Sequence, residues 1–294
     1  MIMKNKLSKS FSLLIIGAVY AVAFAVVYFV FPYLPADNSF LQILYADVIA
    51  TAVVFFFSVV LKNSSTYDAY WSVAPPIIAI HLFLLNPDGL YLRQLIVIAL
   101  VFFWAIRLTL NWARGWQGLR HQDWRYTNIA NKTGAFYWPV SFLGIHLMPT
   151  IMVFLGCLPL WYSLASPNEI NILDMLAILL TFGSVVVEWL ADEQLRNFVK
   201  HAKTGQHMEK GLWAWSRHPN YIGEICFWLG MFLFGLAASG KEAAWTGFGA
   251  LMMIVLFAFI SIPMMDKRSL NRRPGYAGYM KRVPALWFKK PAKK

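Results

Sequence analysis

Residues 211–226 read GLWAWSRHPNYIGEIC, and the apolar run Phe227–Ala238 follows directly. This short stretch holds a cation, a histidine, a proline, an amide, a phenol and a carboxylate. Ionisable and polar side chains at the mouth of a hydrophobic helix are costly unless they are paired or used. We therefore interpret Gly211–Cys226 as the centre of an active site at the end of a membrane helix.

The composition of the whole chain predicts a membrane protein. Of its 294 residues, 59% are hydrophobic and only 14% are charged, whereas soluble domains carry about 25% charged residues. Aromatic residues reach 17%, as expected where Trp and Tyr rings anchor helices at a membrane interface. The chain is expected to form an all-α polytopic helical bundle, and its net charge of +12 is not taken as a sign of nucleic-acid binding.

About eight transmembrane helices are expected, within a range of seven to ten. Val73–Leu85 is short for a hydrocarbon core of about 30 Å and begins with two prolines, so it is tilted, broken or extended backward through Tyr67–Trp71. Phe136–Leu164 contains three prolines and is expected to be kinked or split. The remaining apolar runs are Phe11–Leu34, Phe40–Leu61, Leu90–Trp112, Ile172–Val199, Tyr221–Ala238 and Ala243–Met265.

The distribution of basic residues predicts the orientation of these helices. With the N-terminus inside, the inner segments hold 23 of the 26 Lys and Arg residues, and the outer loops hold only Arg93 and Lys241. Arg107 lies within a span, and Asp174 is expected at the outer interface. This asymmetry follows the positive-inside rule and predicts that both termini and the active site face the cytoplasm.

Two further groups of ionisable residues lie inside apolar runs. Glu188, Asp192 and Arg196 are spaced four residues apart, so they share one helix face. They form either an ion-pair ladder at the helix end or the polar wall of a cavity. Arg107, with Asn111 one turn further on, either extends to the interface or faces inward and binds a phosphate or carboxylate.

A helix is expected to begin at His218–Pro219, because proline suits the first helical turn. The free backbone N–H groups and the positive dipole end of such a helix can hold an anion, with Arg217 beside them. Asn220 and Glu224 share one face one turn deeper and can pair with sugar hydroxyls or an amide. The stretch therefore predicts a nucleotide site, whereas helix capping by His218 and Asn220 and a positive-inside role for Arg217 remain the simpler alternatives.

No metal site is expected. His81 and His146 are isolated histidines in apolar segments, where a core position is the usual role, and no HExxH motif or cysteine pair occurs.

Three motifs carry a family resemblance: ADEQLRNF at 191–198, RHPNYIGE at 217–224 and RRPGYAGYMKRVPALWF at 272–288. Together they resemble the C-terminal half of steroid 5α-reductases and are most similar to the bacterial DUF1295 branch of that family. The broader superfamily includes sterol C14 reductases and isoprenylcysteine carboxyl methyltransferases. The resemblance implies a single transmembrane domain, with a substrate half at 1–104 and a cofactor-binding half at 105–294, in the bacterial inner membrane.

What the resemblance implies is an enzyme that binds NADPH and reduces a carbon–carbon double bond conjugated to a ketone. The hydrophobic, lipid- or steroid-like substrate would enter from the bilayer, with membrane lipids as the surrounding partners. The residues assigned to the cofactor are Arg107, Asn111, Asp192, Arg196, Arg217, His218, Asn220, Tyr221, Glu224, Tyr276 and Tyr279.

The proton donor is assigned to an early span. In the steroid enzymes a Glu and a Tyr on separate early spans polarise the substrate ketone. Counting back from Arg107 places the family tyrosine near Trp104, which cannot act as an acid, so Tyr67, Asp68 and Tyr70 are the candidate catalytic residues.

Two other functions remain open. The methyltransferase branch shares the R-H-P-x-Y motif and uses S-adenosylmethionine, although 264–268 reads MMDKR and lacks the Glu-Glu pair of that branch. A membrane protein without enzymatic activity that retains a vestigial nucleotide site is the third possibility.

Overall fold

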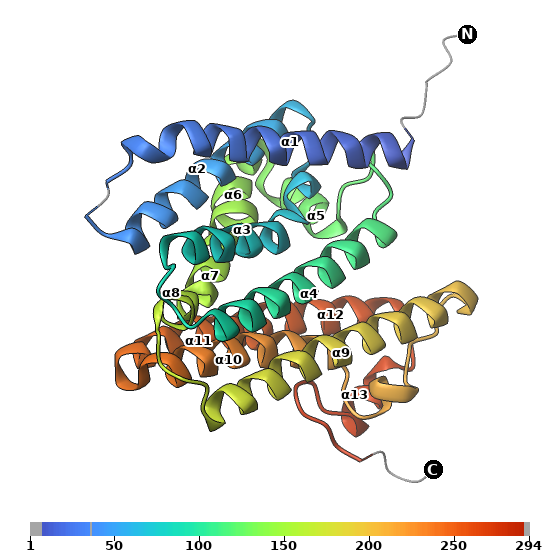
Figure 1. The fold of residues 1–294 in the computed structure, drawn as a ribbon. Helices are drawn as coiled ribbons and strands as arrows, with labels where there is room; N and C mark the ends of the chain where they lie inside the picture. The colour runs from blue at the N-terminus through green and yellow to red at the C-terminus, as the bar shows by residue number, and fades with distance from the viewer. Residues whose placement is uncertain (1–7, 36, 291–294) are drawn as a thin grey trace. The chain divides into compact units, whose positions relative to one another are not determined.

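The computed structural model describes residues 8–35 and 37–290, which form helices and turns without any strand in these ranges (Figure 1). Within these ranges, seven segments are long and apolar enough to cross a membrane. The last of them, Pro219–Arg272, folds back on itself at Gly240 and so holds two packed helical stretches. These observations confirm the predicted polytopic helical bundle of about eight helices.

The chain divides into two compact units, and each is described by itself. The first comprises the described residues up to His81 together with Trp104–Phe154, and the second comprises Leu82–Phe103 and the described residues from Leu155 onward.

The first unit is built on a pair of long, capped helices. The side chain of Ser8 accepts the backbone N–H of Phe11 at the start of α1, and Asn38 caps α2 in the same way. Such caps satisfy N–H groups that have no partner inside the helix. The elements are α1 (Lys9–Val30), η1 (Phe31–Tyr33), α2 (Ser39–Val60), η2 (Ser64–Tyr67), most of α3 (Tyr70–Leu85), the last part of α4 (Tyr91–Gly115), α5 (Trp124–Thr133), η3 (Gly134–Phe136), α6 (Tyr137–Ser141), η4 (Phe142–Leu147) and most of α7 (Met148–Cys157).

Proline shapes two apolar runs of this unit as the sequence predicts. α3 carries Pro75 and Pro76 and is preceded by the short helix η2, so the candidate span runs over Ser64–Leu85. This confirms the backward extension. The run Phe136–Leu164 is broken into several short helices, and η4 within it is a π-helical turn just before Pro149. Prolines and π-turns are the usual causes of sharp helix kinks.

The second unit is built around two long helices that pack against each other, α9 (Ile172–His201) and α10 (Pro219–Ser239). α10 begins at Pro219 after the N-cap residue His218, as predicted, and it ends at Gly240, whose φ of 54° favours glycine. The other elements are the first part of α4, α8 (Pro159–Ala165), η5 (Gly211–Ala214), η6 (Gly240–Thr246), α11 (Gly247–Val255), η7 (Leu256–Ser261), α12 (Ile262–Arg272) and α13 (Tyr276–Arg282).

A buried ion pair joins the starts of α4 and α9 in the second unit. Arg93 Nε lies 2.8 Å from Asp174 Oδ1, and both side chains are fully buried. Arg93 also donates to the backbone carbonyls of Asn168 and Glu169, and Asp174 completes a capping box with Asn171. Arg93 therefore lies in the first turn of α4 rather than in the predicted loop, and Asp174 lies in the first turn of α9. Each charge is sheltered by the other, a pairing that a buried guanidinium requires.

Candidate functional site

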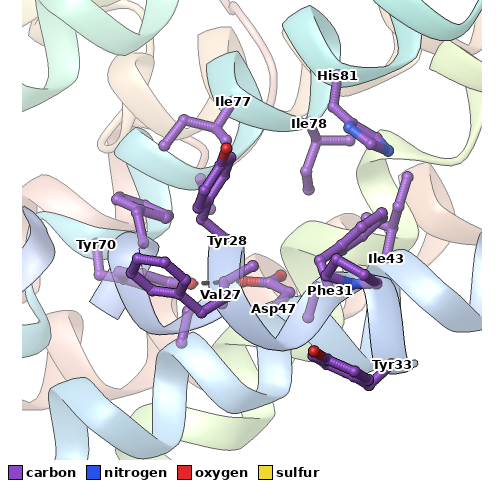
Figure 2. Close-up of a pocket in the computed structure, with 16 residues that line it drawn as sticks. Val27, Tyr28, Phe31, Tyr33, Ile43, Asp47, Tyr70, Ile77, Ile78 and His81 are labelled. Carbon is purple, nitrogen blue, oxygen red and sulfur yellow. Dashed lines mark hydrogen bonds between the residues drawn. The ribbon is translucent and has the colours of Figure 1, made fainter. Parts of the chain in front are cut away.

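The first unit contains a cavity of about 670 Å³ with a mainly apolar lining (Figure 2). This size falls in the range of about 300–1,000 Å³ that small-molecule sites usually have. The lining comes from the second half of α1, from η1, from α2 and from one face of α3. It consists of Phe24, Val27, Tyr28, Phe29, Phe31, Pro32, Tyr33, Ile43, Ala46, Asp47, Ala50, Tyr70, Ala74, Ile77, Ile78 and His81.

A carboxyl–phenol pair lies in the wall of this cavity. Tyr70 Oη donates to Asp47 Oδ1 over 2.7 Å (Figure 2). Asp47 and Tyr70 are 6% and 1% exposed, and Asp47 Oδ2 has no hydrogen-bond partner among the described residues. A buried polar atom without a partner costs about 1–3 kcal/mol, so Asp47 Oδ2 is a candidate contact for a ligand or a water molecule.

The three candidate catalytic residues have different surroundings. Tyr70 lines the cavity, whereas Tyr67 and Asp68 are not among the lining residues. Tyr67 Oη pairs with Thr150 Oγ1 at 2.8 Å, and Asp68 Oδ1 accepts from Tyr126 Oη at 2.6 Å. The geometry therefore favours Tyr70 among the three.

Asp47 was missed by the sequence reasoning, although a signal was present. It is an acidic residue inside the apolar run Phe40–Leu61. An ionisable side chain in such a run is a functional-site candidate by default. Asp47 stands alone in its run, whereas the predicted sites all lie in denser polar clusters.

The two isolated histidines differ in whether their ring nitrogens are hydrogen-bonded. His146 is fully buried, and its Nε2 pairs with Ser58 Oγ at 2.9 Å while its Nδ1 pairs with the carbonyl of Ser141 at 3.0 Å. This confirms a core role for His146. His81 lines the cavity, and its buried Nε2 has no hydrogen-bond partner within 8–35 and 37–290.

In the second unit, four polar residues lie along the packed faces of α9 and α10. Asn220 Nδ2 lies 3.4 Å from Asp192 Oδ1, and Trp228 Nε1 donates to Glu224 Oε1 over 3.1 Å. Glu188, Asp192 and Glu224 are 1%, 8% and 4% exposed. The structure thus brings the predicted face of α9 together with the predicted face of α10.

Gly223 allows this close approach of α9 and α10. A Cβ atom at this position would overlap the side chain of Glu188 and press on the carbonyl of Ser184. The absence of a side chain is therefore what lets the carboxylate of Glu188 lie against the backbone of α10.

A second carboxylate, Asp266, gathers the residues at the start of α10. Arg217 Nη2 lies 2.8 Å from Asp266 Oδ2, while His218 Nε2 and Tyr276 Oη lie 3.1 Å and 2.7 Å from Oδ1. Arg217 Nη1 also donates to the carbonyl of Val283. We call Arg217, His218, Asp266 and Tyr276 the Asp266 cluster. The sequence reasoning assigned Asp266 to the basic tail and missed its central place.

Two more predicted cofactor residues border the Asp266 cluster. The ring of Tyr221 stacks on His218 with centroids 5.1 Å apart, and Tyr279 Oη donates to the carbonyl of Trp213 over 2.5 Å. Burial and the carboxylate of Asp266 raise the pKa of Tyr276 above its ordinary value, and burial followed by the neighbouring Tyr276 raises the pKa of Tyr279. Both phenols therefore stay protonated across the neutral range.

Arg107, Asn111 and Arg196 are the remaining predicted cofactor residues. Arg196 forms an ion pair of 3.5 Å with Glu193 on the same helix. Arg107 and Asn111 belong to the part of α4 in the first unit, where Arg107 is 8% exposed. In the described part of the chain, no three His, Cys, Asp or Glu side chains lie close enough to hold a metal ion.

Comparison with known proteins gives the family. Residues 54–283 match the family described as "Protein of unknown function (DUF1295)". An uncharacterized protein of Schizosaccharomyces pombe is 28% identical over 273 residues, which cover 84% of this chain and 78% of the relative. No solved structure matches the chain significantly. Since the family match spans far more than half of the sequence, the chain belongs to the DUF1295 family.

Proposed function

We propose that this chain is a membrane reductase that uses NADPH to reduce a carbon–carbon double bond conjugated to a carbonyl in a lipid- or steroid-like molecule. The observation that carries the proposal is the Asp47–Tyr70 pair, which lies in the wall of an apolar cavity large enough for such a molecule.

The pair has the groups that a reductase needs beside the substrate carbonyl. Tyr70 has one O–H proton, which it donates to Asp47. With a substrate bound, a neutral Asp47 would donate to the phenol oxygen, so that Tyr70 can donate to the carbonyl oxygen and protonate it as negative charge develops. Asp47 holds the phenol in place through Oδ1. The surrounding apolar side chains exclude water, which strengthens both contacts.

The polar faces of α9 and α10 support the assignment of the cofactor. The amide of Asn220 and the carboxylates of Asp192 and Glu224 are the types of group that bind ribose hydroxyls and a carboxamide. Asp192 Oδ1 on α9 lies 3.4 Å from Asn220 Nδ2, and Asn220 and Glu224 lie in the first two turns of α10. That end of the helix also favours anions such as phosphates. When bound there, NADPH would supply the hydride for the reduction.

The Asp266 cluster has a supporting role in this proposal. Both terminal nitrogens of Arg217 are already engaged, one by Asp266 and one by the carbonyl of Val283. We therefore assign Arg217, His218 and Tyr276 to fixing the start of α10 against α12 and α13. The cofactor contacts are assigned instead to the amide and carboxylates of α9 and α10, on the grounds of their chemistry.

Thermal stability in detergent separates this proposal from the methyltransferase alternative. We expect NADPH to raise the melting temperature of the purified protein and S-adenosylmethionine to leave it unchanged. Glu224→Gln and Asn220→Ala should abolish the protection, whereas Glu242→Gln, a change at an exposed acid, should keep it. Protection by S-adenosylmethionine alone would refute the reductase, and full NADPH protection of both site variants would refute the cofactor site.

A further inference from the structure

We infer that the cavity of the first unit binds an elongated, neutral ligand whose second polar group, a hydroxyl or a carbonyl, hydrogen-bonds to His81. The inference rests on the proposed function for one point, namely that the first polar group of the ligand meets Asp47 and Tyr70. It adds what the far end of the ligand must carry.

Two polar residues lie at opposite ends of the face of α3 that lines the cavity. Tyr70, Ala74, Ile78 and His81 follow one another at helical spacing on one face, and all of them line the cavity. Eleven residues separate Tyr70 from His81, which corresponds to roughly 16 Å along a helix axis. A ligand that reaches both residues is therefore long and narrow.

The cavity lining between these two ends is apolar. Ala74, Ile77 and Ile78 give this face of α3 an apolar middle, and Phe24, Val27 and Ile43 line the cavity from α1 and α2 (Figure 2). Charged groups are expensive in such surroundings. The middle of the ligand is therefore hydrocarbon, and its polar groups are uncharged.

His81 has a ring nitrogen that can hydrogen-bond to a ligand. Its Nε2 atom is buried and has no hydrogen-bond partner in the described part of the chain. The edge-to-face contact with Phe31, with centroids 4.9 Å apart, fixes the plane of the imidazole. A neutral imidazole can donate or accept, so a hydroxyl or a carbonyl satisfies it equally well.

The position of exposed lining residues shows where a ligand can enter the cavity. Tyr28 and Tyr33 line the cavity but remain 75% and 86% exposed. The cavity therefore reaches the surface of the unit beside the end of α1 and η1. Phe31 lies in that same segment, so His81 is near this opening and Tyr70 is further inside. The carbonyl end of the ligand enters first, and the second polar group stays near the mouth.

Equilibrium binding in detergent without NADPH tests the inference. The probes are 25-hydroxycholest-4-en-3-one, whose ketone and hydroxyl lie at opposite ends of an elongated molecule, and cholest-4-en-3-one, which lacks that hydroxyl. A hydrogen bond of about 0.5–1.5 kcal/mol gives the hydroxylated probe about a 2- to 10-fold lower Kd in the wild type. His81→Leu should reduce this ratio to about 1, and His81→Gln should restore part of it.

Control variants show whether a change in the ratio of the two Kd values is specific to His81. His121→Leu, a change at an exposed histidine of the same unit, should leave the ratio unchanged. Tyr70→Phe should weaken both probes equally, because the carbonyl end is common to them. An undiminished ratio in His81→Leu, a selective effect of Tyr70→Phe on the hydroxylated probe, or binding of neither probe to the wild type would overturn the inference.

Failure of the proposed function would look different. If both probes bind with the expected ratio but neither is reduced when NADPH is added, then the reductase proposal fails and the His81 contact stands. If reduction proceeds but the ratio does not depend on His81, then the contact fails and the reductase stands.

Discussion

The two units each contain an aspartate that accepts a hydrogen bond from a tyrosine over 2.7 Å, but the surroundings of the two pairs are opposite. Asp266 also binds Arg217 and His218, so both of its oxygens are satisfied by neighbours within the unit. Asp47 has Tyr70 on one oxygen and, among the described residues, nothing on the other. Beside Asp47 lies a cavity.

The difference separates a structural pair from a candidate catalytic one. A carboxylate whose hydrogen-bonding capacity is filled contributes to the fold and has little left to offer a ligand. A buried carboxylate with a free oxygen lowers the stability of the fold and gains a partner only when a ligand arrives.

The largest expected effect is on activity. Tyr70→Phe removes the proton donor, and loss of a positioned acid typically lowers a rate by about 10²–10⁴-fold. Steady-state reduction of an enone probe with NADPH measures it. Tyr67→Phe is the matched control, because Tyr67 pairs with Thr150 outside the cavity lining. Equal losses in the two variants would show that Tyr70 has no special role.

The next effect is on stability and tests the contrast directly. Asp266→Asn leaves the buried Arg217 without its charged partner, and breaking such a pair costs about 3–5 kcal/mol. Asp47→Asn removes no ion pair among the described residues and should change the free energy of unfolding by less than about 1 kcal/mol. Equilibrium unfolding in detergent compares the two variants, with Asp88→Asn as an exposed control. Similar costs for both would abolish the distinction drawn here.

A smaller effect is expected where α9 and α10 meet. Gly223→Ala adds a methyl group against Glu188 and the carbonyl of Ser184, and overpacking of this kind costs about 1–3 kcal/mol. Gly183→Ala on α9 meets nothing within 4 Å and should be neutral or slightly stabilising, because alanine favours helices. Melting temperatures and NADPH protection of both variants give the comparison. A neutral Gly223→Ala would mean that the helices separate easily.

The smallest effect is a pH dependence. Burial and the carboxylate of Asp266 raise the pKa of Tyr276 above its ordinary value of 10.0. Above that pH the unfolded chain loses the phenolic proton before the folded chain does, so stability falls as pH rises. Tyr276→Phe should lose about 0.5–1.5 kcal/mol near neutral pH and show a flatter decline above pH 10. Parallel unfolding profiles of wild type and variant from pH 8 to about 11 would contradict this.

Much of the fold was predictable because its signals are local. The start of α10 at Pro219, the break in the run Phe136–Leu164 and the extension of Val73–Leu85 all follow from proline and neighbouring residues. Apolar runs and caps act over a few residues, so a single sequence contains what is needed to find them.

The sites were harder to predict because their partners are distant in sequence. Arg217 and Asp266 are 49 residues apart, and Asp47 and Tyr70 are 23 apart. Which of Tyr67, Asp68 and Tyr70 faces the cavity depends on how α2 and α3 pack, and residue spacing alone does not determine it. The cofactor assignments of Arg107, Asn111, Arg196 and the other residues remain predictions.

The ion pair between Arg93 and Asp174 sets an order for the biosynthesis of the second unit. Arg93 is translated 81 residues before its partner, an interval of about 4–16 s at roughly 5–20 residues per second. A buried guanidinium without a counter-charge costs several kcal/mol, so the first turn of α4 cannot settle into its final place during that time. The contact between the starts of α4 and α9 can therefore form only after Asp174 has been synthesised.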